Sequence, residues 1–251
     1  MRTHGARTGR TVMRLGLSPC GSLCGSLCGS LLLAIGTALG LGAQSVVVDQ
    51  GIFSVSIGGE VIGSEEFSIR RAGFGRSATY IASATVTLSR DGGSQELRPL
   101  LSAHAPEGAA DGYQLKVTGI DASEVVLNLV GPRFVSNFRS AAGEEEREFS
   151  ASTHTRIVEQ LVAHHYYFLG NVSEGAQVPV IEPRSRLVMD LVAGAWVDVE
   201  LRLGPNLVDA RKVVFRDGDQ ERVVWFDRQG RVLRVEIPAL QYVAERQDLV
   251  G

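Results

Sequence analysis

The sequence is poor in the residues and motifs that mark many functions. Lysine occurs only at Lys116 and Lys212. The chain contains neither the His-Glu-x-x-His pattern of zinc hydrolases nor the Gly-x-Ser-x-Gly elbow of serine hydrolases. The stretch 73–77, GFGRS, lacks the lysine of a phosphate-binding loop, so we interpret it as a turn. We therefore expect no enzyme and no cofactor.

Only the N-terminal segment has a net positive charge. The only charged residues before Asp49 are four arginines, at positions 2, 7, 10 and 14, so the rest of the chain has a net charge of −7. A nucleic-acid binder would need a basic surface to contact phosphates. We therefore expect no nucleic-acid partner. The hydrophobic fraction of 44% and charged fraction of 21% also exclude collagen-like and broadly disordered proteins.

A short apolar run follows these arginines. The run Leu31–Ala43 is too short to cross a hydrocarbon core of about 30 Å, and small residues come after it. This order predicts a signal peptide over residues 1–45, with cleavage after Ala43 or Ser45, and a periplasmic or secreted protein. The alternative is that the run is retained as an anchor. We expect no membrane span in the mature chain.

All cysteines of the chain lie in this N-terminal segment. Cys20, Cys24 and Cys28 belong to the repeat CGSLCGSLCGSL, upstream of the predicted cleavage site. Their spacing suggests a metal site, but no histidine is nearby and the segment is discarded on export. We therefore predict no metal site and, in the mature protein, no thiol chemistry.

The mature chain, residues 46–251, is dominated by strand patterns and has no linker that would divide it. Apolar and polar residues alternate in 53–57, and glycine-containing turns such as Asp91-Gly92-Gly93 and Asp217-Gly218-Asp219 separate successive strands. Short strands joined by short turns favour an antiparallel meander. We expect a single mainly β domain.

One segment carries a helical pattern instead. Between Thr155 and Leu169, apolar residues recur at helical spacing, and Gly170-Asn171 supplies a stop signal. The pattern predicts one long amphipathic helix over about 154–169. Its polar face would carry Arg156 and Glu159.

Three stretches together resemble a known architecture. These are GIFSVSIGGEVIG at 51–63, HHYYFL at 164–169 and VWFDRQGRVLRVEIP at 224–238. They resemble uncharacterised bacterial periplasmic β-rich proteins, which are similar in architecture to the lipoprotein-carrier (LolA/LolB-like) half-barrels. The resemblance implies a strongly curved antiparallel sheet, a half-barrel or open barrel, with the helix packed in its concavity and an apolar cavity beside it. It transfers no catalytic residue.

The histidines at 154, 164 and 165 are the one constellation that suggests acid–base or metal chemistry. Neighbouring residues on a helix point about 100° apart, so His164 and His165 cannot both chelate one ion easily. The simpler interpretation is that His165 is a half-buried aromatic residue and His164 is solvated.

Aromatic residues supply the predicted ligand site. Tyr166 and Phe168 fall at the end of the expected helix, and Trp196 and Trp225 fall on expected strands. Aromatic side chains can line an apolar pocket, or they can simply fill the space between helix and sheet.

The sequence thus predicts an exported, non-enzymatic envelope protein that binds or carries an apolar ligand, such as a lipid, or a lipidated partner. The alternative is a structural or assembly protein whose concave face is fully packed and holds no ligand. Cavity volume discriminates between the two.

Overall fold

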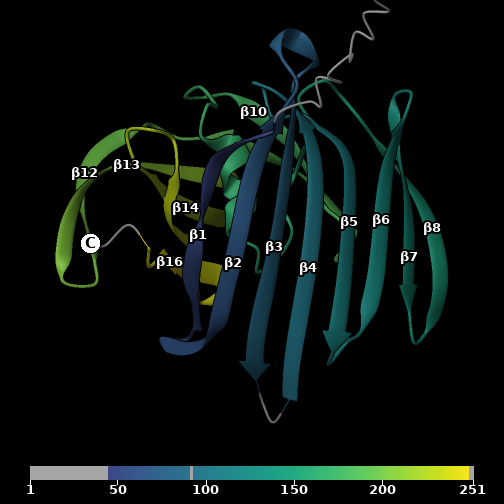
Figure 1. Ribbon diagram of the computed structural model, residues 1–251, viewed down its shortest axis with the longest axis horizontal. Helices are drawn as coiled ribbons and strands as arrows, with labels where there is room; N and C mark the ends of the chain where they lie inside the picture. Colours follow the sequence, from purple (N-terminus) through teal and green to yellow (C-terminus); the bar gives the residue numbers. More distant parts are fainter. Residues whose placement is uncertain (1–44, 91–92, 249–251) are drawn as a thin grey trace, which may run out of the picture. The chain divides into compact units, whose positions relative to one another are not determined.

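The protein is described by a computed structural model that covers residues 45–90 and 93–248. The predicted signal peptide lies outside the described residues except for Ser45. In the part of the chain that the structure describes, one 16-stranded sheet forms the whole scaffold (Figure 1). The prediction of a mainly β, antiparallel domain is confirmed at this level.

The first arm of the sheet is an antiparallel meander of eight strands in sequence order. Its strands are β1 Val46–Ile57, β2 Glu60–Ala72, β3 Thr79–Arg90, β4 Gly93–His104, β5 Ala110–Gly119, β6 Ser123–Val130, β7 Arg133–Ser140 and β8 Gly143–Ser150. The acidic run 144–146 lies in β8 and pairs with β7. Charged side chains on this edge strand oppose pairing with another chain.

The second arm contains the other eight strands and extends from β16, which lies beside β1, to β9 at the opposite edge of the sheet. Its strands are β9 Arg156–Ile157, β10 Gln177–Glu182, β11 Leu187–Ala193, β12 Val197–Leu203, β13 Asn206–Asp217, β14 Gln220–Phe226, β15 Val232–Ile237 and β16 Tyr242–Arg246. The last strand, β16, pairs with β1, so the two ends of the domain meet in one seam. Sequence analysis did not predict β16.

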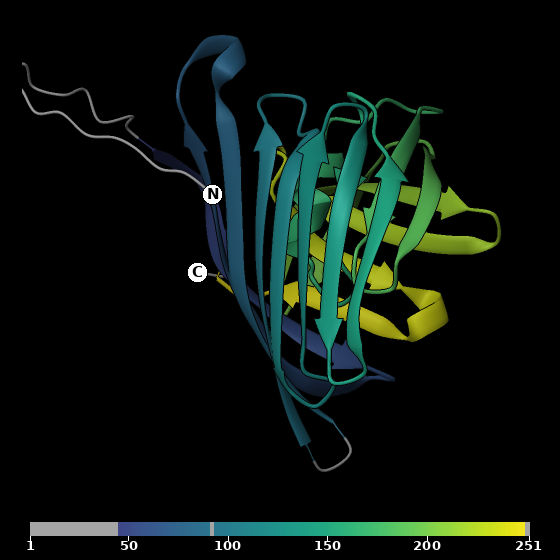
Figure 2. The ribbon, with the colours of Figure 1, turned by 90° about the vertical axis from the view of Figure 1, so that its right-hand side faces the viewer.

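The sheet curves until its two arms nearly meet on the far side (Figure 2). The Ala110 amide of β5 donates to the Thr155 carbonyl, next to β9, over 2.9 Å. Arg186, in the β10–β11 turn, forms an ion pair with Glu145 of β8 and lies 5.3 Å from the centre of the Phe138 ring of β7. These contacts make the fold barrel-like.

The predicted long amphipathic helix over 154–169 is not present, which corrects the fold class. The segment instead forms β9, a series of turns and a six-residue 3-10 helix, η2 His164–Leu169. Leu161 has a positive φ of 64°, which interrupts any α-helix. The residues expected on the solvent face, Arg156 and Glu159, are buried, because strands surround the segment on several sides.

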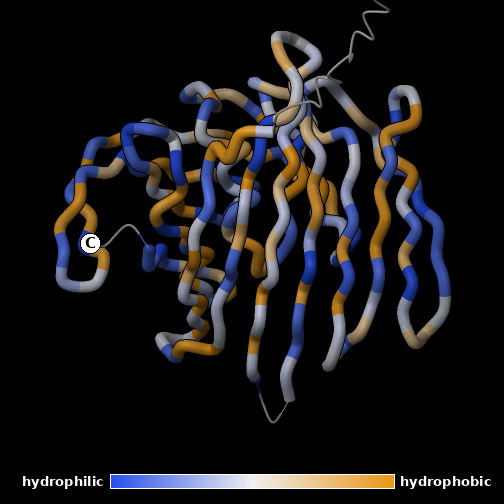
Figure 3. Tube along the Cα trace, in the orientation of Figure 1, coloured by the Kyte–Doolittle hydropathy of each residue, from blue (hydrophilic) through white to orange (hydrophobic). Residues whose placement is uncertain are grey.

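Period-two alternation decides which side chains enter the interior. In β2, Phe67 and Ile69 are buried while Glu66 and Arg70 are exposed, and the same alternation of apolar and polar residues runs along β3–β6 (Figure 3). A second, smaller apolar cluster covers the opposite face of β13–β15. It consists of Leu201, Leu203, Ala210, Val223, Trp225 and Leu233.

Candidate functional site

Segment 151–176 fills the interior of the curved sheet and brings polar side chains into it. Glu65 of β2 accepts hydrogen bonds from the Ala163 amide over 2.6 Å, from the His164 amide over 2.9 Å and from His164 Nδ1 over 2.6 Å. Both side chains are fully buried. Glu65 therefore holds the start of η2 against the sheet.

His165 lies beside His164, with ring centroids 4.6 Å apart. The Glu159 amide donates to His165 Nδ1 over 3.1 Å, which places the proton of a neutral ring on Nε2. Burial, and to a smaller extent the neighbouring His164, lower the pKa of His165 well below its ordinary value. The predictions of a solvated His164 and a half-buried His165 are wrong, since both rings are fully buried.

Glu159 is the fourth member of a buried group, with Glu65, His164 and His165, that we call the interior cluster. Burial raises its pKa to about 7, although Arg184, whose Nε lies 3.3 Å from Glu159 Oε1, opposes the shift. The Tyr113 hydroxyl lies 3.5 Å from Glu159 Oε2, and burial, followed by the Glu159 charge, raises the Tyr113 pKa.

A carboxylate, an imidazole and a second titratable carboxyl are the parts of an acid–base site. Here they are enclosed: Glu65, His164 and His165 expose none of their surface. The interior cluster is therefore arranged to hold segment 151–176 against the strands. Within residues 45–90 and 93–248, no three His, Asp or Glu side chains are grouped closely enough to hold a metal ion.

Open space remains at the two ends of the interior. At the end formed by the β4–β5 and β6–β7 turns is a groove of about 650 Å³, which we call the rim groove. Its walls are mainly apolar and include Ala109, Ala110, Leu129, Pro132 and Ala151, with His104, Glu107 and His154 as polar members. This volume is within the usual range for small-molecule sites.

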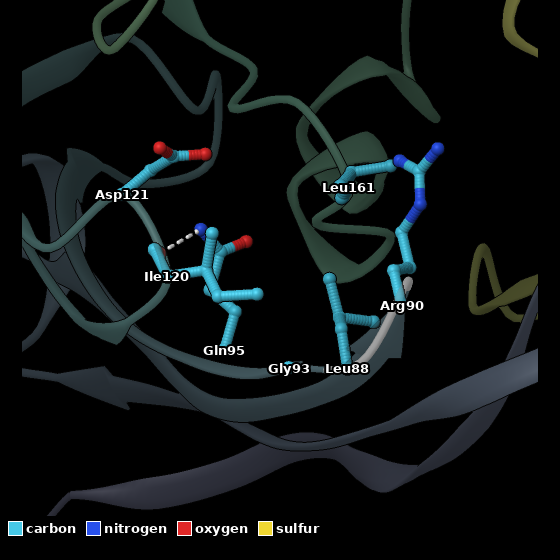
Figure 4. A pocket seen from close by; sticks show the side chains of 7 residues that line it. All are labelled: Leu88, Arg90, Gly93, Gln95, Ile120, Asp121 and Leu161. Atoms are coloured by element: carbon cyan, nitrogen blue, oxygen red, sulfur yellow. Dashed lines mark hydrogen bonds between the residues drawn. The ribbon is translucent and has the colours of Figure 1, made fainter.

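The opposite end holds a smaller pocket of about 230 Å³ (Figure 4). Leu161 closes it from segment 151–176, opposite Ile120 and Leu88. Gln95 spans one wall and donates to the Ile120 carbonyl over 2.7 Å. The pocket is below the size expected for a drug-sized ligand.

The four aromatic residues predicted to bind a ligand do not converge on one space. Tyr166 and Phe168 are buried in the main core. Phe168 lies behind the β4–β5 turn, because a side-chain carbon added at Gly108 would be 3.0 Å from its ring. Glu107 and Ala109 of that turn line the rim groove, so Phe168 is behind the groove wall.

The two tryptophans lie farther along the second arm. Trp196 is half-buried, packs on Phe226 with ring centroids 5.5 Å apart, and donates to the Val172 carbonyl over 3.0 Å. Trp225 belongs to the second apolar cluster, on the opposite face of β14 from Phe226. The structure therefore places Tyr166 and Phe168 in the main core, packs Trp196 against that core, and places Trp225 in a separate cluster.

Sequence analysis singled out His154 but missed the other residues of the rim groove and the role of Glu65. Leu129 lies at the end of β6 and Ala151 just after β8, and the pairing of β6, β7 and β8 brings them together: the Ala151 amide donates to the Pro132 carbonyl over 2.9 Å. Glu65 falls on the inward face of β2 by strand parity, so an acidic residue at an apolar position was the available signal.

Comparison with known proteins supports the fold alone. No protein-family model and no curated protein matches the chain. The chain is similar to the crystal structure of a β-barrel-like protein of a domain of unknown function, DUF1849, from Brucella abortus, with a TM-score of 0.50 and 9% sequence identity over 79% of this chain and 94% of that one. The resemblance to lipoprotein carriers is thus confirmed only as a curved, barrel-like β fold. No helix in the described residues is long and apolar enough to cross a membrane.

Proposed function

We propose that the protein binds an apolar ligand of acyl-chain size in the rim groove, as a non-enzymatic protein of the cell envelope. The observation that carries the proposal is the mainly apolar wall of this groove of about 650 Å³. Burying each methylene of a chain contributes about 0.8 kcal/mol, so a partly enclosed chain binds with useful affinity. His104, Glu107 and His154 offer hydrogen bonds to a polar end of the ligand.

A pair of neighbouring residues on β6 tests this proposal. Leu129 lines the groove, whereas Val130, the next residue along the chain, is exposed and is not among the lining residues. Leu129→Asp places a charge in the apolar wall and should weaken binding of a fluorescent fatty acid by about tenfold or more. Val130→Asp should leave binding unchanged. Equal titration curves for both variants, or no saturable binding by the wild type, would exclude the groove.

The packed interior favours a second candidate function, a structural or assembly protein without a ligand. Tyr166, Phe168 and both buried histidines occupy the space where a half-barrel carrier would hold its cargo. This candidate predicts that native mass spectrometry of protein purified from the envelope finds no co-purifying lipid, whereas ligand binding predicts a bound mass that Leu129→Asp removes.

The placement in the envelope rests on the N-terminal arginines and the apolar run Leu31–Ala43. N-terminal sequencing of the exported protein should begin at Gln44 or Val46. A full-length product that stays in the cytoplasm would contradict this part of the proposal without affecting ligand binding.

A further inference from the structure

The hairpin formed by β2 and β3 carries an exposed aromatic residue at its tip. Phe74 is 76% exposed, and the hairpin projects beyond the neighbouring strand ends (Figure 2). A large apolar side chain on such a projecting tip has no role in the core. The tip therefore has the form of a contact element.

The tip is held in a defined conformation. Gly73 and Gly75, on either side of Phe74, have φ angles of 78° and 62°, which favour glycine. The Ser77 hydroxyl donates to the Phe74 carbonyl over 3.0 Å. The Ala105 amide donates to the Ala78 carbonyl over 2.9 Å and ties the base of the tip to the β4–β5 turn. Because the tip is ordered, little conformational entropy is lost when it binds.

Exposed residues beside the tip extend the apolar surface and add positive charge. In the sheet, Val47 lies opposite Arg70, and Arg70 lies opposite Ile81. We define the hairpin patch as the exposed residues on both faces of this end of the sheet: Val47, Arg70 and Ile81 on the outer face, Val46 and Arg71 on the inner face, and Phe74 at the tip. Within the described residues, neither arginine of the patch has an ion-pair partner.

Negative charge is missing from this part of the chain. The sequence contains no Asp or Glu from residue 67 to residue 90, although the domain is acidic overall. Asp49, the nearest carboxylate on β1, is buried and bound by Arg246. The patch therefore combines exposed apolar side chains with two arginines outside any ion pair of the described residues, while the carboxylates of Glu66 and Asp248 line a hollow that Arg70 also lines. Apolar side chains beside positive charge are the composition by which proteins bind the surface of an anionic bilayer.

We propose that the hairpin patch binds the surface of an anionic lipid bilayer, with Phe74 inserted among the acyl chains and Arg70 and Arg71 beside lipid phosphates. This contact is separate from the rim groove and does not depend on ligand binding there. It would hold the protein at a membrane surface without a membrane-spanning helix.

The test measures protection at the hairpin itself, so that vesicle binding by residues 1–44 is not mistaken for binding by the patch. Amide hydrogen exchange of the full chain is measured with vesicles of equal parts phosphatidylglycerol and phosphatidylcholine, and with vesicles of phosphatidylcholine alone. We expect protection of residues 72–78 on the anionic vesicles, and none at the β1–β2 turn, which lies beside the similarly exposed Val61 of β2.

Variants then assign the protection to the patch. Phe74→Ser should raise the lipid concentration for half-maximal protection by about tenfold or more. Replacing Arg70 and Arg71 by Gln should raise it by about 25-fold on anionic vesicles, with little change on neutral ones. Val61→Ser and Arg202→Gln, two exposed positions outside the patch, are the controls. Absence of protection, equal protection by neutral vesicles, or unchanged protection in the patch variants would overturn the proposal.

Discussion

Two buried polar clusters, one at the seam between β1 and β16 and one in the interior, satisfy their charges to different degrees. At the seam, Arg246 donates to both carboxylate oxygens of Asp49, over 3.0 and 2.8 Å, and also to Asp248. In the interior, Nε2 of His164 and Nε2 of His165 have no hydrogen-bond partner among the described residues. A saturated ion cluster fixes one arrangement of strands, whereas a partly satisfied cluster favours neutral groups.

The pKa directions differ between the two clusters at the basic groups and agree at the carboxyl groups. Burial alone would lower the pKa of Arg246, but hydrogen bonds to Asp49 and Asp248 outweigh it and raise the pKa. At Asp49 burial outweighs the shared guanidinium, so the pKa of this carboxyl is raised. The two carboxylates of Asp49 and Asp248 thus stabilise the charged form of Arg246. In the interior, burial shifts both Glu159 and His165 toward their neutral forms.

The largest expected effect is the loss of the seam cation. Arg246→Met leaves Asp49 buried without its partner and should lower the free energy of unfolding by about 3–5 kcal/mol. Adding Asp49→Asn should recover part of the loss, because the unpaired charge is then removed. Urea denaturation measures both. A loss below about 1 kcal/mol would show that the pair does not hold the seam.

A smaller effect is expected where the interior cluster meets β2. Glu65→Ala leaves the Ala163 and His164 amides and His164 Nδ1 without their acceptor, and should cost about 2–3 kcal/mol. Glu66→Ala, at the next residue on the exposed face, should be nearly neutral. Equal denaturation midpoints for the two variants would mean that Glu65 does not anchor segment 151–176.

The pH dependence separates the two titrating groups of the interior. The pKa of Glu159 rises from 4.5 to about 7 on folding, so the folded state holds the extra proton and this group makes stability fall as pH rises from 4.5 to 7. The pKa of His165 falls well below 6.5, so this group makes stability fall as pH drops below 6.5. The two contributions oppose each other between pH 4.5 and 6.5.

Single variants should expose each contribution. Glu159→Gln should leave a stability that rises with pH up to 6.5, and His165→Asn one that falls between pH 4.5 and 7. Each slope is at most about 1.4 kcal/mol per pH unit. Urea denaturation at several pH values measures them, with the wild type as reference. Parallel profiles for the two variants would contradict the assignment.

The smallest effect is expected for an exposed ion pair with the same separation as the seam pair. Arg228 and Asp209 are 2.8 Å apart but largely exposed. Arg228→Ala should change stability by no more than about 0.5 kcal/mol, because water screens the pair. A cost close to that of Arg246→Met would show that distance matters more than burial.

Local patterns in the sequence were sufficient to predict most strands and turns. Alternation in β1 and the glycine-containing turn after β13 depend on residues within a few positions of each other, and both are confirmed. The same parity places Trp225 and Phe226 on opposite faces of β14. Strand periodicity follows from backbone geometry alone, so it can be recognised without knowing the fold.

Tertiary structure decided what surrounds each element. Apolar residues at helical spacing in 155–169 indicated a helix with one buried face, but strands surround this segment, Ile157 pairs with Ile181 of β10, and Glu65, 99 positions away, binds His164. Likewise β16 is defined by its pairing with β1, and the rim groove by contacts that residues 151–155 make with the β6–β7 turn and with β5. These features depend on contacts between distant residues, which no local pattern records. The sequence by itself therefore determined most strands and the alternation of their faces, and the curved sheet decided which face lies inside and what surrounds it.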